Sequence, residues 1–428
     1  MANHICTTDR ITSIIGEGVG KEVCVSDGDL LVVETAPGCW GPMITPSVSG
    51  GHEITGPVWV KDAEPGDAVA LTIEQVEVLS SATSSGTGRV NPGFFDKDPS
   101  VKAICPFCHI NNPETELRGT GEEAVRCKKC GSPILPQTFE NGYTVVCDHE
   151  SGLAVVVDGE TAQQIAQDTL EGKLYLPKGA KQHLATILGR ADFSGLVVRS
   201  RPMVGNIGCS PSGRIPASKN AGDCYLSVGN TDLFAPVGKE QITDAHMDIK
   251  SVGEGCVVIS PVLVPGAGVY VGDVHLTQGD GEIAGHTLDI SARVSVRVAL
   301  IKHLNIEGPI LIPSVSELDS RFVPFSDEEY DRADKLLARY GKRLPVRNYP
   351  IQFIGSGSNM NEGMENAFDR AQKLTGLPRG ELMNRATVGG EIGIGRTSGL
   401  VYLTMMLEEK TLEKMGLLKL VLAQYNKQ

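Results

Sequence analysis

Alternating hydrophobic and polar positions run through most of the chain and predict many short β-strands. The longest such run lies at 288–301, where hydrophobic residues take the even positions from 288 to 292 and polar residues take the odd positions. A Pro-Gly-Ala-Gly turn separates two more strand-like runs, 257–264 and 269–276. Half-buried strands of this kind form sandwiches or barrels. Further strands are predicted at 23–25, 30–34, 58–60, 69–73, 143–147 and 153–157.

The hydrophobic spacing becomes helical near residue 326. Ser326 and Glu329 form a capping-box pattern, which predicts a helix reaching to about residue 340. Hydrophobic residues at helical spacing between Met364 and Leu374 predict a second helix. The predicted fold class is therefore mainly β, with a β-sandwich core and a C-terminal α/β portion.

Two segments in the middle of the chain interrupt the strand pattern. Residues 80–100 are rich in Ser, Gly, Thr, Asn and Pro, which predicts a loop. Residues 160–170 predict a short helix with Asp158 as its N-cap.

Composition narrows the class of protein. The chain has 428 residues, 50 of them glycine, and a formal net charge of −13. Nucleic-acid affinity depends mainly on clustered Lys and Arg, so this charge argues against a nucleic-acid partner. The longest hydrophobic run, 400–407, is far too short for a membrane span, so we predict no membrane partner.

Four cysteines form the most specific local motif: Cys105, Cys108, Cys127 and Cys130. Two C-x2-C pairs at this spacing predict a closed structural zinc site. The site would lie in an inserted ribbon of about 30 residues, which is too small to bury a hydrophobic core of its own. The alternative is two disulfides, but no secretory leader pattern begins the chain and the other seven cysteines show no pairing pattern. We therefore predict a cytoplasmic location.

Two fragments combine His with Asp at a spacing of two. Asp273 and His275 follow a hydrophobic strand, and His246 and Asp248 repeat the pattern upstream. In strands, residues two apart share a face, so the four side chains predict an open site for a catalytic divalent ion, Zn²⁺ or similar. Such an ion activates water for amide hydrolysis. The alternative is that both pairs are solvated turn residues.

A polar turn, Gln278-Gly-Asp280-Gly-Glu282, follows the first of these fragments. Its glycines allow it to bring Asp280 or Glu282 back over the same face. Glu282 is then a candidate to transfer protons.

The run 272–282, Gly-Asp-Val-His-Leu-Thr-Gln-Gly-Asp-Gly-Glu, resembles the signature of the acetamidase/formamidase family. The Pro-Val segment from Pro261 to Ala267, the Thr-Gly-Pro motif at 55–57 and the Ala-Glu-Pro-Gly-Asp motif at 63–67 are similar to further family motifs. The resemblance implies a β-sandwich with an α/β tail, a homo-oligomer, and hydrolysis of small linear amides to acid and ammonia. It also implies active-site positions at Asp248, Asp273, His275, Gln278, Asp280 and Glu282, with Glu282, Asp280, Gln278 and Asp248 as the catalytic group.

This sequence departs from the family pattern at two places. Ala245-His246 stands where the usual motif has Gly-Asn, and the ribbon is not part of the commoner pattern. Both changes leave the amide substrate open: the rival hypotheses are a hydrolase of cyclic amides, imides or N-formyl compounds, and a non-catalytic scaffold that binds partners through its ribbon.

We predict four parts of the chain. Residues 1–100 form the N-terminal β part of the core and residues 101–135 form the zinc ribbon. Residues 136–320 form the β core that carries the active-site motifs, and residues 321–428 form the C-terminal α/β portion.

Weaker candidates have simpler explanations. His52 and Cys224 are single residues without partners in the pattern. The Gly-Ser loop 355–359 lacks the lysine partner of serine amidases, and we expect it to cap a helix. The glycine-rich run 389–395 fails the dinucleotide fingerprint, and its Glu391 is a candidate for a distal pocket carboxylate.

Overall fold

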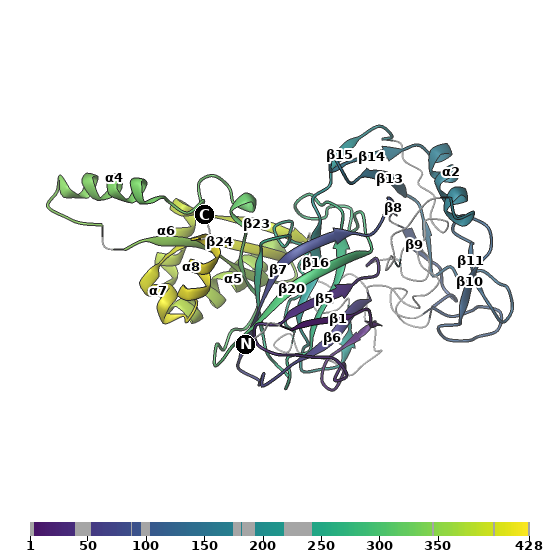
Figure 1. The fold of residues 1–428 in the computed structure, drawn as a ribbon, viewed down its shortest axis with the longest axis horizontal. Coiled ribbons are helices and arrows are strands. Elements are labelled where there is room, and N and C mark those ends of the chain that lie inside the picture. The colour runs from purple at the N-terminus through teal and green to yellow at the C-terminus, as the bar shows by residue number, and fades with distance from the viewer. Residues whose placement is uncertain are drawn as a thin grey trace.

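A β-sandwich forms the centre of the molecule (Figure 1). The computed structural model describes residues 4–38, 53–86, 88–95, 103–173, 181, 193–217, 242–344, 346–396 and 399–426. Its larger sheet has nine strands in the order β1-β5-β20-β7-β18-β21-β22-β24-β23. These strands are β1 (Ile5–Thr8), β5 (Leu30–Glu34), β20 (Ala292–Ile301), β7 (Ala68–Val78), β18 (Val257–Pro261), β21 (Ile310–Ile312), β22 (Asn348–Ser356), β24 (Leu400–Glu408) and β23 (Gly390–Arg396).

A smaller sheet covers one face of this large sheet. Its strands are β16 (Met203–Cys209), β19 (Val269–His275), β6 (Ile54–Val60), β2 (Ile11–Thr12) and β4 (Cys24–Val25), and a short pair joins β3 (Ile14–Ile15) to β17 (Ile215–Pro216). A single hydrophobic cluster lies between the sheets and takes Leu71 from β7, Val296 from β20, Val58 from β6 and Val271 from β19, all fully buried. Burial of alternate residues on facing strands produces this core, and the predicted sandwich is confirmed.

The C-terminal portion extends the same large sheet beyond the sandwich. Strands β21–β24 carry helices α5 (Met360–Thr375), α6 (Arg379–Gly389), α7 (Glu409–Lys414) and α8 (Leu418–Tyr425) over a second hydrophobic cluster. Asn359 caps α5 through Glu362 N, as expected for the Gly-Ser loop, and Gly376 ends it with a φ of 71°, a conformation that favours glycine. The glycine-rich run 389–395 begins at the last residue of α6 and continues in β23.

Helix α4 (Asp327–Ala338) projects from this end of the molecule, beyond the 3-10 turn η3 (Val315–Glu317) (Figure 1). The Ser326 hydroxyl accepts a hydrogen bond from Glu329 N, and Ser326 N donates one to the Glu329 carboxylate, so the predicted capping box is confirmed. None of the residues of α4 is buried.

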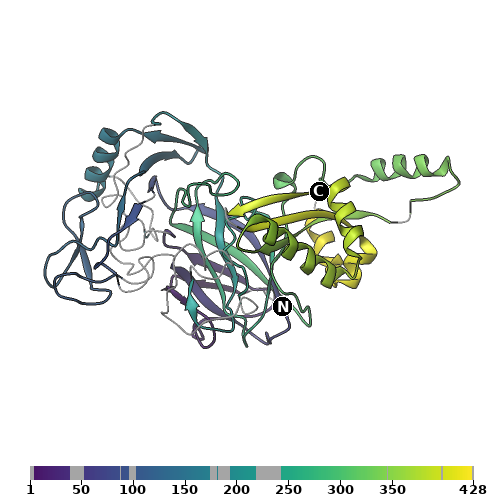
Figure 2. The same ribbon diagram turned by 180° about the vertical axis from the view of Figure 1, so that it is seen from behind.

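An inserted part lies at the opposite end of the long axis (Figure 2). It contains a four-stranded antiparallel sheet in the order β15-β14-β13-β8, formed by β15 (Val197–Arg199), β14 (Leu153–Val157), β13 (Tyr143–Asp148) and β8 (Ala82–Ser85). Helix α2 (Gly159–Leu170), capped by Asp158 as predicted, and the pairs β9 (Gly88–Val90) with β12 (Gln137–Phe139) and β10 (Thr115–Leu117) with β11 (Val125–Cys127) complete it.

The prediction of a loop at 80–100 is wrong, because β8 and β9 lie in it. Polar residues such as Thr83 and Ser84 fill β8, and they are buried against the sandwich. Thr83 Oγ1 donates to the carbonyl of Asp289 at 2.7 Å, so tertiary contacts override the loop-like composition.

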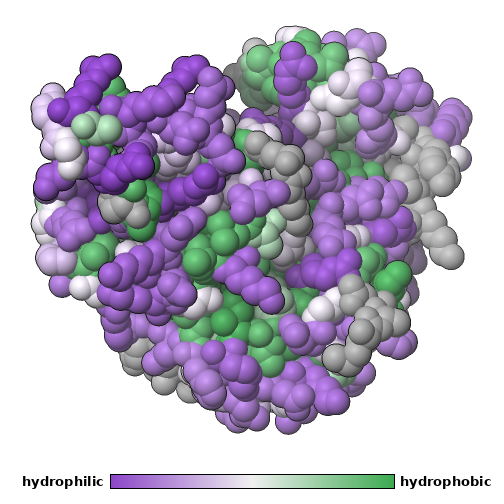
Figure 3. All heavy atoms as spheres, turned by 60° about the vertical axis from the view of Figure 1, so that its left-hand side comes forward, coloured by the Kyte–Doolittle hydropathy of each residue, from purple (hydrophilic) through white to green (hydrophobic). Residues whose placement is uncertain are grey.

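Hydrophilic side chains predominate on the face shown in Figure 3, and the hydrophobic ones form smaller areas between them. Among the residues described, no helix has both the length and the apolar character that a membrane crossing requires.

Candidate active site

His246 and Asp273 bring two distant stretches of chain together inside the protein. His246 Nε2 lies 2.8 Å from Asp273 Oδ2 and 3.3 Å from Asp248 Oδ2, and all three residues are buried. The expectation that His246 and Asp248 lie on one strand is wrong: the segment has only an isolated bridge from His246 to Asn206. Asp248 has a φ of 48°, which interrupts an extended strand, yet its side chain still turns toward His246.

Asp273 and His275 share one side of β19, as predicted. Asp273 Oδ1 and His275 Nε2 are 3.4 Å apart. His275 Nε2 is also 3.4 Å from Asp289 Oδ1, a carboxylate that the sequence analysis missed. Asp289 stands at a polar position of an alternating run, which suggested a solvent-facing residue, but it is fully buried. The idea that the His–Asp pairs are solvated turn residues is therefore wrong.

The side chains of the polar turn that follows β19 point in different directions. Gln278 Oε1 accepts a hydrogen bond from His275 Nδ1 at 2.8 Å, and its amide nitrogen donates to the carbonyl of Asp248. Glu282 is buried within the same charge cluster. Asp280 instead points outward and forms an ion pair with Lys250 at 2.6 Å, with two-fifths of its side chain exposed.

Arg396 is the second residue that the sequence analysis missed. Its Nη1 lies 3.0 Å from Asp248 Oδ2 and 3.1 Å from His246 Nε2. The bridge between Gly281 and Arg396 ties the polar turn to the end of β23. No local pattern around Arg396 signals this role, because the contact depends on how the C-terminal portion packs. Glu391, on the same strand, is partly exposed and lies 3.8 Å from Arg321.

Three acidic residues of the cluster have left-handed backbone conformations. Asp248, Asp273 and Glu282 have φ angles of 48°, 53° and 39°. Such angles are unfavourable for residues with a Cβ, and they persist where the surrounding structure requires them, often at functional sites. Gly205 forms the wall beside them: a Cβ there would lie 2.3 Å from Asp248 Oδ1.

The cluster contains more acidic side chains than permanently positive ones. Burial raises the pKa of Glu282 to about 8, and the neighbouring charge of Asp248 acts in the same direction. Burial also raises the pKa of Asp289 to about 6, although His275 opposes the shift. Although burial disfavours charge, the two histidines hold the pKa of Asp273 well below its usual value. A buried set of this kind is stabilised by added positive charge.

The donor set fits a divalent cation. The ligand atoms of His246, Asp248 and Asp273 lie within 4.8 Å of one another, as do those of Asp273, His275 and Asp289. Asp248 Oδ1, Asp273 Oδ1 and His275 Nε2 are buried and make no hydrogen bond. Two ligands at about 2.1 Å from one ion are about 3.0–3.4 Å apart, which matches the 3.4 Å between Asp273 Oδ1 and His275 Nε2. Gln278 holds His275 through Nδ1, the usual support for a ligand that binds through Nε2.

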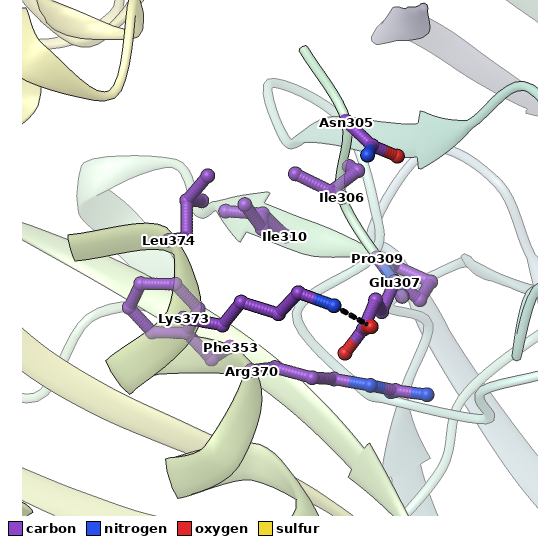
Figure 4. Close-up of a pocket in the computed structure, with 10 residues that line it drawn as sticks. Asn305, Ile306, Glu307, Pro309, Ile310, Phe353, Arg370, Lys373 and Leu374 are labelled. Atoms are coloured by element: carbon purple, nitrogen blue, oxygen red, sulfur yellow. Dashed lines mark hydrogen bonds and ion pairs between the residues drawn. The ribbon is translucent and has the colours of Figure 1, made fainter. Parts of the chain in front are cut away.

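A partly buried ion pair holds the segment that carries His246 and Asp248. Arg370 of α5 donates to Asp244 Oδ2 at 2.5 Å, and Ser356 donates to the same oxygen at 2.9 Å. Figure 4 shows Arg370 beside a hollow that also contains the ion pair of Lys373 with Glu307. This hollow holds about 40 Å³, room for little more than a water molecule, so it is not a substrate site.

The four cysteines of the ribbon converge as predicted. Cys105 Sγ lies 3.3 Å from Cys130 Sγ, Cys108 Sγ lies 3.8 Å from Cys127 Sγ, and all four sulfur atoms fall within 4.8 Å of one another. Four sulfurs at about 2.3 Å from a tetrahedral zinc ion are about 3.8 Å apart, so the set fits zinc. Backbone hydrogen bonds from His109 N to Cys105 O and from Gly131 N to Cys127 O form the two knuckles.

Removing one buried thiolate is expected to release the ribbon's metal. We expect Cys127→Ser to lower the zinc content by one ion per chain and to make residues 103–134 sensitive to protease, because a ribbon this small depends on its metal for folding. Metal analysis and limited proteolysis measure both effects. Cys24→Ser, an exposed cysteine outside the ribbon, is the control and should keep the zinc. Full zinc content in Cys127→Ser would contradict the four-thiolate site.

Comparison with known proteins matches this chain to a family. The profile of the Acetamidase/Formamidase family matches residues 39–241 and 237–374. A Schizosaccharomyces pombe protein whose name proposes a formamidase is 23% identical over 303 residues, which are 66% of this chain and 62% of that protein. An acetamidase from Mycolicibacterium smegmatis is 24% identical over 71% of this chain and 68% of its own length. The chain thus matches somewhat less than two thirds of the first relative.

Solved structures show the same fold. A predicted acetamidase/formamidase from Thermoanaerobacter tengcongensis superposes with a TM-score of 0.54 at 18% identity, covering 97% of this chain and 98% of that one. An acetamidase from Bacillus halodurans gives a TM-score of 0.52 at 16% identity, covering 96% of this chain and 99% of that one.

Two of the weaker candidates from the sequence, His52 and Cys224, lie outside the described residues.

Proposed function

The chain belongs to the acetamidase/formamidase family, and on this premise we propose that it hydrolyses the C–N bond of a small amide to a carboxylate and ammonia. The observation that carries the proposal is the burial of Glu282 in one cluster with His246, Asp248, Asp273 and His275. These residues come from separate stretches of the chain. A scaffold protein has no need to bury so many ionisable groups together, so their convergence favours catalysis.

Glu282 is our candidate general base. Its raised pKa, about 8, is close to neutral pH, where a carboxylate can both accept and return a proton. It takes a proton from the attacking water and delivers it to the departing nitrogen, which leaves as ammonia.

Other residues bind and orient. His246, Asp248, Asp273, His275 and Asp289 would hold a divalent ion, most simply zinc. When bound there, such an ion supplies a polarised carbonyl and a more acidic water molecule. Gln278 fixes the ring of His275, and Arg396 holds Asp248 and His246 in place. The family resemblance predicts Asp280 at the active site, but its side chain pairs with Lys250 at the surface, so we propose that Asp280 lies at the edge of the site and takes no part in the proton transfer.

We also propose a homo-oligomer in the cytoplasm. Helix α4 buries none of its residues, and Leu336 is 56% exposed. An isolated helix of this length is marginal in water, so contact with another copy would stabilise it. Sedimentation equilibrium of the purified chain measures the oligomer size.

The cytoplasmic location is supported by the cysteines. The described cysteines form no disulfides, which suits a reducing compartment.

Ammonia release tests the proposal directly. We expect purified protein to release ammonia and the matching acid from acetamide or formamide in equal amounts, with the rate proportional to protein concentration. A coupled ammonia assay measures the first product and chromatography the second. A protein that releases neither product from any amide, while retaining its fold and its metals, would contradict the proposal.

A further inference from the structure

An apolar pocket lies between the inserted sheet and the turn that carries Gln278. It encloses about 490 Å³, within the range of about 300–1,000 Å³ found for small-molecule sites. The inserted sheet contributes Tyr143, Val145, Val156 and Val198. The segment 277–288 contributes the facing wall.

The pocket adjoins the proposed hydrolytic site. Gln278 lines the pocket and accepts the hydrogen bond from His275 Nδ1, so this side chain contacts both the pocket and the cluster. Leu288 also lines the pocket and is followed directly by Asp289, which lies 3.4 Å from His275 Nε2. A substrate whose amide reaches the cluster can therefore place a substituent in the pocket.

The chemistry of the lining favours an apolar substituent. Among the described residues that line the pocket, none is Asp, Glu, Lys or Arg. His286 is held by Ser85, whose Oγ lies 2.9 Å from its Nδ1, and burial lowers the pKa of His286 to about 4, which keeps it neutral. The rings of Tyr143 and Phe193, 5.4 Å apart between centroids, offer an aromatic surface.

We infer that this pocket receives the acyl group of an amide that is larger and more apolar than acetamide, namely an aromatic or branched aliphatic primary amide. The inference rests on the proposed function, because a reaction that releases ammonia leaves every substituent on the acyl side. Formamide and acetamide are far smaller than this pocket and would leave it empty. The inserted sheet thus selects the substrate.

A series of primary amides tests the inference. We expect kcat/KM to rise from acetamide through isovaleramide to phenylacetamide by roughly tenfold to a hundredfold, because each buried CH₂ contributes about a factor of four. Filling the pocket with Val198→Trp should lower the ratio of kcat/KM for phenylacetamide to that for acetamide by at least about tenfold. Val197→Trp, the exposed neighbour on the opposite face of β15, is the matched control and should keep the wild-type ratio.

Binding measured by calorimetry separates this inference from the proposed function. If no amide is hydrolysed, but phenylacetamide binds to the wild type and to Val197→Trp and not to Val198→Trp, the pocket assignment stands and the proposed reaction fails. If acetamide is hydrolysed with a kcat/KM equal to or above that of every larger amide, the inference fails and the reaction stands. Faster hydrolysis of N-benzylformamide than of phenylacetamide would overturn the acyl assignment. The wild-type series decides the inference even where Val198→Trp does not fold.

Discussion

Glu282→Gln is expected to lower kcat for amide hydrolysis by about 10²–10⁴-fold and to leave the fold intact. The range is that of a lost general base, and the amide keeps the size of the side chain while removing its ability to accept a proton. Steady-state ammonia release measures the rate, and circular dichroism checks the fold.

Asp280→Asn is the matched control for this substitution. It makes the same chemical change two residues earlier on the same turn, at a side chain that pairs with Lys250 near the surface. We expect a loss of less than about tenfold, since a surface ion pair contributes little. Equal losses in the two variants would show that the turn as a whole matters and that Glu282 is not the base.

The substitution Glu282→Gln should also stabilise the protein at alkaline pH. The pKa of Glu282 is raised from 4.5 to about 8 on folding, so the folded state holds a proton that the unfolded chain has released. Stability from this group is complete below pH 4.5 and is lost as the pH rises to about 8. Glutamine does not titrate, so the variant should gain on the order of 4 kcal/mol in unfolding free energy at pH 9 and nothing at pH 4.

Denaturant unfolding at the two pH values measures this gain. A cation bound beside Glu282 favours its charged form and reduces the difference, so we expect the largest gain without added divalent ions. A variant less stable than the wild type at pH 9 would show that Glu282 is not a buried proton carrier.

Asp273→Asn is expected to remove both hydrolysis and the second metal ion. Asp273 is shared by the two candidate ligand groups, with one oxygen near His246 and the other near His275. An amide is a weak ligand, so we expect the divalent ion content to fall by one per chain and kcat to fall by about a thousandfold or more, which corresponds to the several kcal/mol that such an ion provides.

The ribbon variant supplies the control for this experiment. Cys127→Ser should lose the ribbon's zinc and keep the ion at Asp273, while Asp273→Asn should do the opposite. Metal content measured by mass spectrometry on both proteins distinguishes the two sites. An Asp273→Asn protein that retains wild-type activity and two ions per chain would show that Asp273 does not hold the second ion.

Much of this architecture could be predicted from local pattern. The strands of the sandwich core, the capping box at Ser326 and the helix that ends at Gly376 follow from alternation, spacing and turn chemistry. The cysteine ribbon follows from spacing alone, because the C-x2-C knuckles are local turns. The family motif around Glu282 was also visible, since its residues are adjacent in the chain.

The local sequence pattern could not predict the environment of a residue where distant parts of the chain form that environment. The polar segment that forms β8 pairs with β13 and packs on the sandwich, so its burial overrides its composition. Asp289 is part of an alternating run but faces His275, and Arg396 reaches His246 and Asp248 across 150 and 148 positions.

By itself the sequence determined the family, the sandwich with its helical tail, the cysteine ribbon, and the His, Asp and Glu residues that approach one another. Only the tertiary structure decided that Glu282 turns inward while Asp280 turns out, that Asp289 and Arg396 join the cluster, and that the inserted sheet encloses an apolar pocket beside it. The physical reason is that strand and helix patterns depend on neighbours within a few residues. Burial, pKa and cavity shape depend on surfaces that meet only after the chain has folded.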